Sequence, residues 1–140
     1  MSIISKIMKL HYSPKNNPRV IVIQKIYSKT FNKEEKITFE KHRFKKFIKD
    51  VVLGTLERDE VLYEEINKSL NDIKFQNMDK ILQTIIKSAA YELLYKTKIP
   101  RKIIIKEYLN ASNFFIDSSK TKYLNALLDK ISKEVRKNNE

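Results

Sequence analysis

The sequence predicts an all-α fold. Residues 78–100 carry the clearest helical pattern in the chain, because their apolar residues recur at helical spacing over one broad face. The 140-residue chain contains a single glycine, Gly54, whereas β-rich domains ordinarily need glycine in their turns. We therefore expect one helical domain with the helix at residues 78–100 at its centre. The face of that helix consists of Ile81, Leu82, Ile85, Ile86, Ala89, Ala90, Leu93 and Leu94.

Two N-terminal segments come before this helix in the predicted order. Residues 1–18 form a basic arm that ends in SPKNNP, where two prolines and two asparagines disfavour a helix. Residues 19–31 are locally ambiguous. The β-branched run at residues 20–23 is typical of a strand, whereas the longer spacing out to Ile26 and Tyr27 fits a helix. No hairpin turn lies nearby, so the context favours a helix.

Two further helices and a connection lead to the central helix. The apolar positions of residues 34–56 fit one helical face from Phe44 onwards, and residues 57–71 continue as an acidic helix. Gly54 marks either the junction of these helices or a point of close packing. Residues 71–77 then form a short connection.

The C-terminal part of the chain predicts two more helices. Pro100 ends the central pattern, because the residue before a proline is pushed out of the helical region, and it fits the first turn of the next helix. We expect a last helix from Ser118 to Val135, with Asp117 or Ser118 as its N-cap. Its predicted apolar stripe consists of Tyr123, Leu124, Leu127, Leu128, Ile131 and Val135.

The composition argues against several kinds of site. There is no cysteine, so disulfides and thiolate chemistry are excluded, and a cytoplasmic location fits. The two histidines, His11 and His42, have no partner at metal-site spacing. No carboxylate pair or serine motif indicates catalysis, no apolar run could span a bilayer, and the N-terminus lacks the continuous apolar core of a signal peptide. We expect a non-enzymatic binding protein without a cofactor or metal.

The charge of the chain favours a polyanionic partner. The net charge is +12, of which residues 1–49 carry +10, residues 50–81 carry −4 and residues 82–140 carry +6. A basic N-terminal third of this kind favours nucleic acid. A membrane surface and an ordinary lysine-rich solvated surface are the alternatives.

Four segments, in this order, resemble the NusB family of transcription antitermination factors. They read RVIVIQKIYS (19–28), AAYELLYKTKIP (89–100), IIIKEYLNASNFF (103–115) and KTKYLNALLDKIS (120–132). The family favours Tyr-Glu-Leu followed by Ile-Pro in the second segment and Lys-Phe-Val-Asn-Gly in the fourth. The sequence departs from the family where an arginine-rich run is reduced to Lys15 and Arg19, and where Ala126 and Ile116 replace glycines. Phe75 stands near the position of a family tryptophan.

The resemblance implies two small helical bundles packed as one RNA-binding domain over residues 19–140. It also implies binding of boxA-type single-stranded RNA, pairing with the ribosomal protein NusE, and a place in an RNA polymerase antitermination complex that supports ribosomal RNA transcription. There are two alternatives. One is a NusB-like scaffold that binds protein without RNA, and the other is a helical module of the kind found in ribosomal RNA methyltransferases.

The candidate RNA-binding residues come from two regions. In the first, Lys15 and Arg19 supply cations for phosphates, and Tyr27 is either a stacking platform for a base or a half-buried core tyrosine.

The second region is the start of the last helix, where a helix N-terminus attracts phosphate and Ser119 could donate to it. Lys122 and Asn125 share one face with Asp129. Tyr123 either stacks on a base or packs on the first bundle, and Asn125 either reads a base edge or caps a neighbouring backbone.

Overall fold

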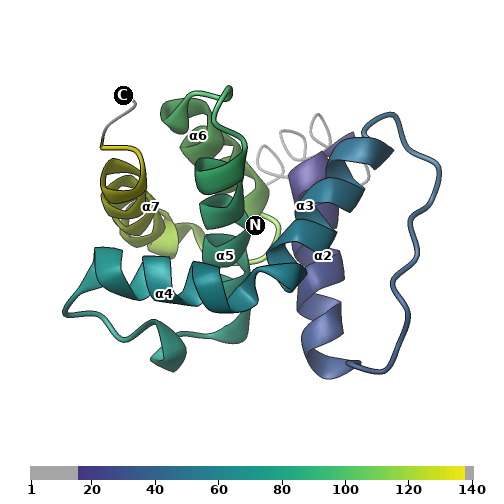
Figure 1. Cartoon of the computed structure of the whole chain (residues 1–140), viewed down its shortest axis with the longest axis horizontal. Helices are drawn as coiled ribbons and strands as arrows, with labels where there is room; N and C mark the ends of the chain where they lie inside the picture. Colours follow the sequence, from purple (N-terminus) through teal and green to yellow (C-terminus); the bar gives the residue numbers. More distant parts are fainter. Residues whose placement is uncertain (1–15, 138–140) are drawn as a thin grey trace.

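The computed structural model describes residues 16–137, and all regular structure in this range is helical, as predicted (Figure 1). Most of the basic arm, including Lys15, lies outside the described residues. The α-helices are α2 (Pro18–Phe31), α3 (Lys45–Glu57), α4 (Asp59–Leu70), α5 (Lys80–Tyr95), α6 (Arg101–Ser112) and α7 (Thr121–Val135), and the 3-10 helices are η2 (Phe75–Asn77) and η3 (Ser118–Lys120). No helix in residues 16–137 is long and apolar enough to cross a membrane.

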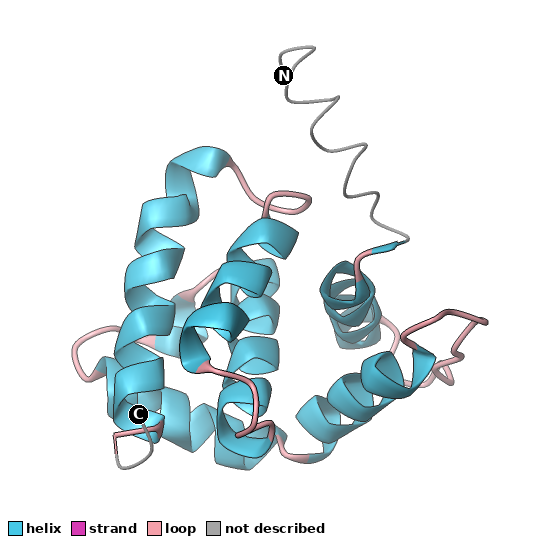
Figure 2. Ribbon diagram, turned by 90° about the horizontal axis from the view of Figure 1, so that it is seen from above, coloured by secondary structure: helices cyan, strands magenta, loops and turns pink. Residues whose placement is uncertain are grey.

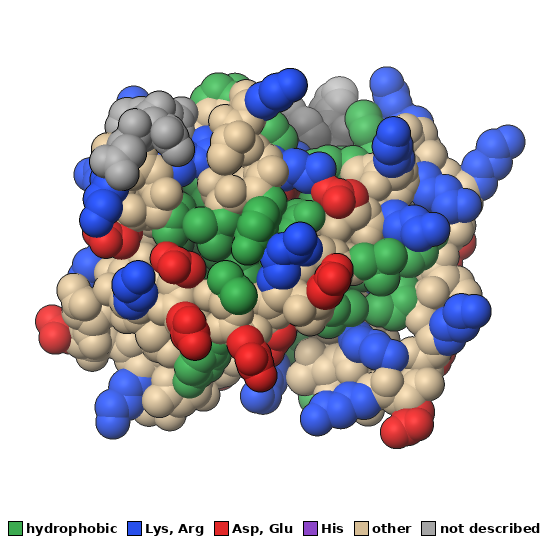
Figure 3. Space-filling model, in the orientation of Figure 1, with side chains coloured by type: hydrophobic (Ala, Val, Ile, Leu, Met, Phe, Trp, Pro, Cys, Tyr) green, Lys and Arg blue, Asp and Glu red, His purple; other side chains and the backbone are tan. Residues whose placement is uncertain are grey.

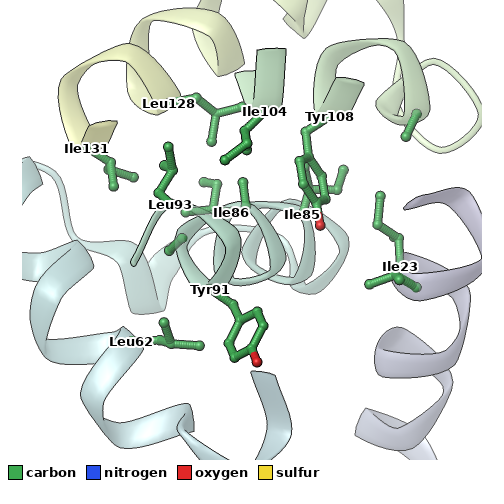
Figure 4. Close-up of a cluster of buried hydrophobic side chains, with 14 of the residues drawn as sticks. Ile23, Leu62, Ile85, Ile86, Tyr91, Leu93, Ile104, Tyr108, Leu128 and Ile131 are labelled. Atoms are coloured by element: carbon green, nitrogen blue, oxygen red, sulfur yellow. The ribbon is translucent and has the colours of Figure 1, made fainter. Parts of the chain in front are cut away.

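The helix α5 is the centre of the fold. It packs against α2, α3, α4, α6 and α7. Its residues Ile85, Ile86 and Leu93 are buried, and side chains from α2, α4, α6 and α7 converge on them (Figure 4). The pair α2 and α3 lies to one side of the group formed by α4, α6 and α7, and α2 also packs on α6 (Figure 1 and Figure 2). The two helical groups therefore share one central helix, as the apolar face of residues 78–100 predicts.

The segment at residues 19–31, whose pattern is ambiguous in the sequence, belongs to the helix α2. Asn17 is the N-cap of α2, because its side-chain oxygen accepts hydrogen bonds from the backbone N–H groups of Arg19 (3.0 Å) and Val20 (3.3 Å). Pro18 occupies the first turn, where its missing N–H costs nothing. The run that resembles a strand is buried on the inner face of this helix, at Val20, Val22 and Ile23.

Residues 32–44 contain no helix, and α3 begins at Lys45 with Phe44 as its N-cap, which confirms the helical face expected from Phe44 onwards. Ile37 and Phe39 are half-buried against the core without being helical. The segment is held along α2 by Lys25, whose Nζ donates to the carbonyl of Thr38 (2.6 Å) and pairs with Glu40 (3.3 Å). Residues 32–44 therefore form an extended segment that covers part of the core beside α2.

The central helix is shorter than the apolar pattern predicts. It ends at Tyr95, and the chain turns before Pro100, the N-cap of α6. Arg136, directly after α7, is only 2% exposed, and its side chain holds this turn closed. Its guanidinium donates to the carbonyls of Leu93 (2.8 Å) and Lys96 (3.0 Å), and also to those of Glu92 and Ile99. One side chain therefore ties the last turn of α5 to the turn that follows it; the carbonyls of Glu92 and Lys96 also accept backbone hydrogen bonds, from Lys96 and Ile99.

Gly54 is a point of close packing and not a helix junction, since α3 continues to Glu57 and the junction with α4 lies at Arg58. A Cβ atom added to Gly54 would lie 2.3 Å from the ring of Tyr91. The missing side chain lets α5 place this ring against α3.

Candidate nucleic-acid interface

The second predicted region forms a compact surface where η3 leads into α7. Asp117 is the N-cap of η3, and its carboxylate accepts a hydrogen bond from the backbone N–H of Ser119 (3.2 Å). The last helix is therefore not continuous from Ser118, because one 3-10 turn comes before α7. The side chain of Ser119 is exposed, but a phosphate at its N–H would have to displace the Asp117 carboxylate.

The predicted residues of α7 are exposed beside this turn. Lys122, Tyr123 and Asn125 lie within the first turns of α7 and all three face solvent. Tyr123 is 46% exposed, so its place in the predicted apolar stripe is wrong, and Leu124 takes the buried position next to it. An exposed phenol ring between a cation and an amide offers a base a flat surface, a phosphate contact and a hydrogen-bonding group.

Asn125 also lines a groove of about 470 Å³ between α6 and α7. The α6 side contributes two lysines and two asparagines, and the α7 side adds Thr121 and Asp129. Lys122 does not line this groove, although its spacing from Asn125 and Asp129 on the continuous helix α7 is that of one helix face. The residues on the α6 side were missed in the sequence, although the spacing of four residues that joins the first three of them is visible there; they are Lys102, Lys106, Asn110 and the C-cap Asn113.

The one acidic side chain of this groove, Asp129, is already paired with cations. It accepts hydrogen bonds from Lys133 (3.0 Å) and Arg101 (3.2 Å). The bond from Lys133 is the main cause that holds the pKa of Asp129 below its ordinary value; burial opposes this, and Arg101 adds to the lowering. Because its charge is compensated, Asp129 does not prevent the lysines of α6 from attracting a polyanion.

In the first predicted region, Arg19 lies inside the protein. Its Nη2 and Nε donate to the two carboxylate oxygens of Glu92, at 2.6 and 3.0 Å, and its guanidinium lies over the rings of Phe47 and Tyr108. Glu92 is fully buried, and Arg19 is 9% exposed. Burial opposes the charge of Arg19, but its hydrogen bonds to Glu92 and the charge of that carboxylate outweigh burial and raise the pKa. The guanidinium is therefore committed to the core, not offered to a phosphate.

Tyr27 is half-buried on α2, and its ring meets that of Phe31 edge-on at 5.0 Å. The Tyr27 side chain is therefore partly packed and partly exposed. The helix α6 packs on both α2, which carries Tyr27, and α7, which carries Tyr123.

Basic side chains also gather on the α2 side of the molecule. In Figure 3, Lys and Arg dominate the right-hand part of the surface, over α2, α3 and their connecting segment, whereas most Asp and Glu side chains lie further left. Residues 16–137 contain no group of three or more side chains that could hold a metal ion.

The sequence model of the NusB family matches residues 8–133. This chain belongs to the NusB family. The four segments that resemble NusB therefore belong to one family relationship, which extends over nearly the whole chain.

Individual NusB proteins are more distant. A transcription antitermination protein NusB of Bradyrhizobium diazoefficiens is 30% identical over 91 residues, which cover 64% of this chain and 55% of that protein. The protein of the same name from Coxiella burnetii is 32% identical over 91 residues, with 65% of each chain covered. The matched region thus spans between about half and two thirds of these relatives.

The fold agrees with a solved NusB structure. NusB of T. maritima superimposes with a TM-score of 0.73 over 87% of this chain and 92% of that chain, at 20% sequence identity. This match confirms the predicted all-α NusB architecture.

Proposed function

We propose that this chain is a transcription antitermination factor that binds boxA-type single-stranded RNA together with the ribosomal protein NusE. In this proposal it is non-enzymatic and acts in the cytoplasm, within an RNA polymerase antitermination complex on nascent ribosomal RNA. Family membership supports the proposal, as does the name of the relatives, transcription antitermination protein. The observation that carries it is the exposed group Lys122, Tyr123 and Asn125 at the start of α7.

These residues have separate roles in the proposed site. Lys122 contacts a phosphate, Tyr123 stacks on a base, and Asn125 bonds a base edge at the mouth of the groove between α6 and α7. The hydroxyl of Ser119 donates to a phosphate of the RNA backbone. Tyr27 extends the site on α2, Lys15 of the basic arm adds a cation for a phosphate, and Arg19 supports the site from the core by fixing α2 against α5.

A titration of boxA-type RNA tests the proposal. RNA labelled with a fluorophore is titrated with the protein at several salt concentrations, with and without NusE, and the anisotropy is measured. We expect tighter binding with NusE and a negative slope of log K against log salt, because each phosphate contact in single-stranded RNA contributes about −0.7 to the slope. A scrambled RNA of equal length is the control.

The enclosure of Arg19 favours one alternative, a NusB-like scaffold that binds NusE without RNA. The arginine-rich run of the family is already reduced to two cations here, and one of them is paired with Glu92. Binding to NusE with equal, weak affinity for boxA and scrambled RNA would identify that scaffold. Binding to structured ribosomal RNA but not to NusE would instead indicate the module related to methyltransferases.

A further inference from the structure

A second polar cavity lies away from the start of α7, where α2, α3, α4 and α5 meet. It has a volume of about 330 Å³. Four lysines line it, and we call it the four-lysine pocket: Lys29 of α2, Lys33 just after α2, Lys80 at the start of α5, and Lys87 two turns further along α5.

The charge of the four-lysine pocket is only partly compensated. Its one acidic residue, Asp59, lies 2.6 Å from Lys87 and pairs with it. Lys29 donates to a backbone carbonyl, which leaves its charge in place. Neither Lys33 nor Lys80 has a carboxylate within ion-pair distance in residues 16–137, and both are exposed. Three positive charges around one cavity repel one another, and an anion would relieve that repulsion.

The hydroxyl groups of the pocket add a second, independent observation. Thr30 and Thr84 also line it, and each donates to a carbonyl of its own helix, at 3.3 and 2.9 Å. Thr55 lines it too and is only 1% exposed, yet its hydroxyl has no hydrogen-bond partner among the described residues. A buried hydroxyl without a partner is costly and therefore uncommon. Thr55 therefore brings a buried hydroxyl without a partner to the same cavity that the four lysines line.

We propose that the four-lysine pocket binds a phosphate group. The ammonium groups of Lys29, Lys33 and Lys80 compensate its charge, and the hydroxyl of Thr55 donates to a phosphate oxygen or to a water that the phosphate holds. This site is separate from the proposed RNA surface on α7 and does not rest on it. A free phosphorylated small molecule and an RNA backbone both present this chemistry, and the test separates them.

Inorganic phosphate is the first probe. The full chain is titrated with it at constant ionic strength, and binding is measured by thermal unfolding and by amide chemical shifts. We expect saturable binding that raises Tm, with the largest shifts at Thr55 and Lys80. The double variant Lys33→Gln/Lys80→Gln should bind at least fivefold more weakly. The matched control Lys46→Gln/Lys49→Gln removes two exposed α3 lysines outside the pocket and should change binding less than twofold. The absence of saturable binding, or equal losses in the two double variants, would overturn the proposal.

Thr55→Val tests the floor of the site without removing charge. The variant should raise Tm without phosphate, because a buried hydroxyl without a partner is gone, and should weaken phosphate binding at least threefold. If Thr55→Val gains stability but binds phosphate as tightly as wild type, the hydroxyl of Thr55 does not contact the phosphate, and that part of the proposal is wrong.

The source of the phosphate is decided with two more titrants. If it is an RNA backbone, Lys33→Gln/Lys80→Gln makes the salt slope for single-stranded RNA about 1.4 less steep, at about 0.7 for each lost contact. If it is a free small molecule, a 5′-mononucleotide binds in the pocket and the RNA slope is unchanged. Lys122→Gln should leave phosphate binding intact, so this site and the proposed RNA surface can fail separately.

Discussion

The guanidinium of Arg19 holds the carboxylate of Glu92 in a two-pronged ion pair, with contacts of 2.6 and 3.0 Å, across 73 residues of sequence. Tyr108 of α6 donates its hydroxyl to the same carboxylate. The buried carboxylate of Glu92 on α5 therefore links α2 and α6 to the central helix.

Breaking this ion pair should strongly destabilise the fold. Arg19→Ala leaves a buried carboxylate without its cation, and we expect a loss of about 3–5 kcal/mol in the free energy of unfolding, measured with urea. Asp59→Ala, which breaks the partly exposed pair with Lys87, should cost only about 0–1 kcal/mol. The double variant Arg19→Met/Glu92→Leu should lose less than the sum of its single variants. Additive losses would show that the two side chains act independently.

Tyr108→Phe should change how stability depends on pH. Burial, and then the charge of Glu92, raise the pKa of Tyr108 well above its ordinary value of 10.0. Because the folded pKa is the higher one, the contribution of the phenol is complete below about pH 10 and is lost as pH rises towards the folded pKa. The wild-type advantage over Tyr108→Phe should therefore shrink above pH 10, by at most about 1.4 kcal/mol per pH unit. Urea unfolding from pH 7 to 11 measures it, and parallel curves would contradict it.

Gly54→Ala should destabilise the protein when residue 91 is tyrosine and stabilise it when residue 91 is leucine. Alanine in a helix is favoured over glycine by about 1 kcal/mol, but the new Cβ would overlap the ring of Tyr91 and displace it. We expect a net loss of up to about 2 kcal/mol in wild type and a gain of up to about 1 kcal/mol in a Tyr91→Leu background. Thermal unfolding of the four proteins compares them. The same sign in both backgrounds would contradict the packing explanation.

Tyr123→Ala should weaken boxA binding by about 1–3 kcal/mol if the ring stacks on a base, and Tyr123→Phe should bind as wild type does. Tyr95 on α5 is a matched control, because it is 42% exposed against 46% for Tyr123, and Tyr95→Ala should leave RNA binding unchanged. Lys122→Gln should reduce the salt slope by about 0.7. Fluorescence anisotropy measures all four variants. Equal losses for the two alanine variants would remove Tyr123 from the site.

Most helices were predictable because their apolar spacing is local. The faces of α5 and α7 are visible in the sequence, and only Tyr123 was placed wrongly, since an aromatic ring next to a buried stripe looks the same whether it packs or is exposed. The segment at residues 32–44 was harder, because Ile37 and Phe39 are half-buried against the core without any helical pattern.

The candidate site was less predictable than the fold. Arg19 looked like a surface cation because its partner, Glu92, belongs to a distant helix, and sequence spacing says nothing about such a pair. The four-lysine pocket is likewise assembled from four helices and one connection. The residues of α6 that line the groove with α7 do carry a local signal, the spacing of four residues between Lys102, Lys106 and Asn110.

The position of Arg136 sets when a growing polypeptide can close this domain. A ribosome that has added Val135 has made every α-helix of the described fold, yet the carbonyl of Leu93 still lacks its side-chain donor, and that of Lys96 has only the backbone N–H of Ile99. The next residue supplies that donor, more than 40 positions after Leu93. The turn between α5 and α6 therefore depends on a residue made after all the described helices, and a chain that ends before Arg136 lacks these contacts.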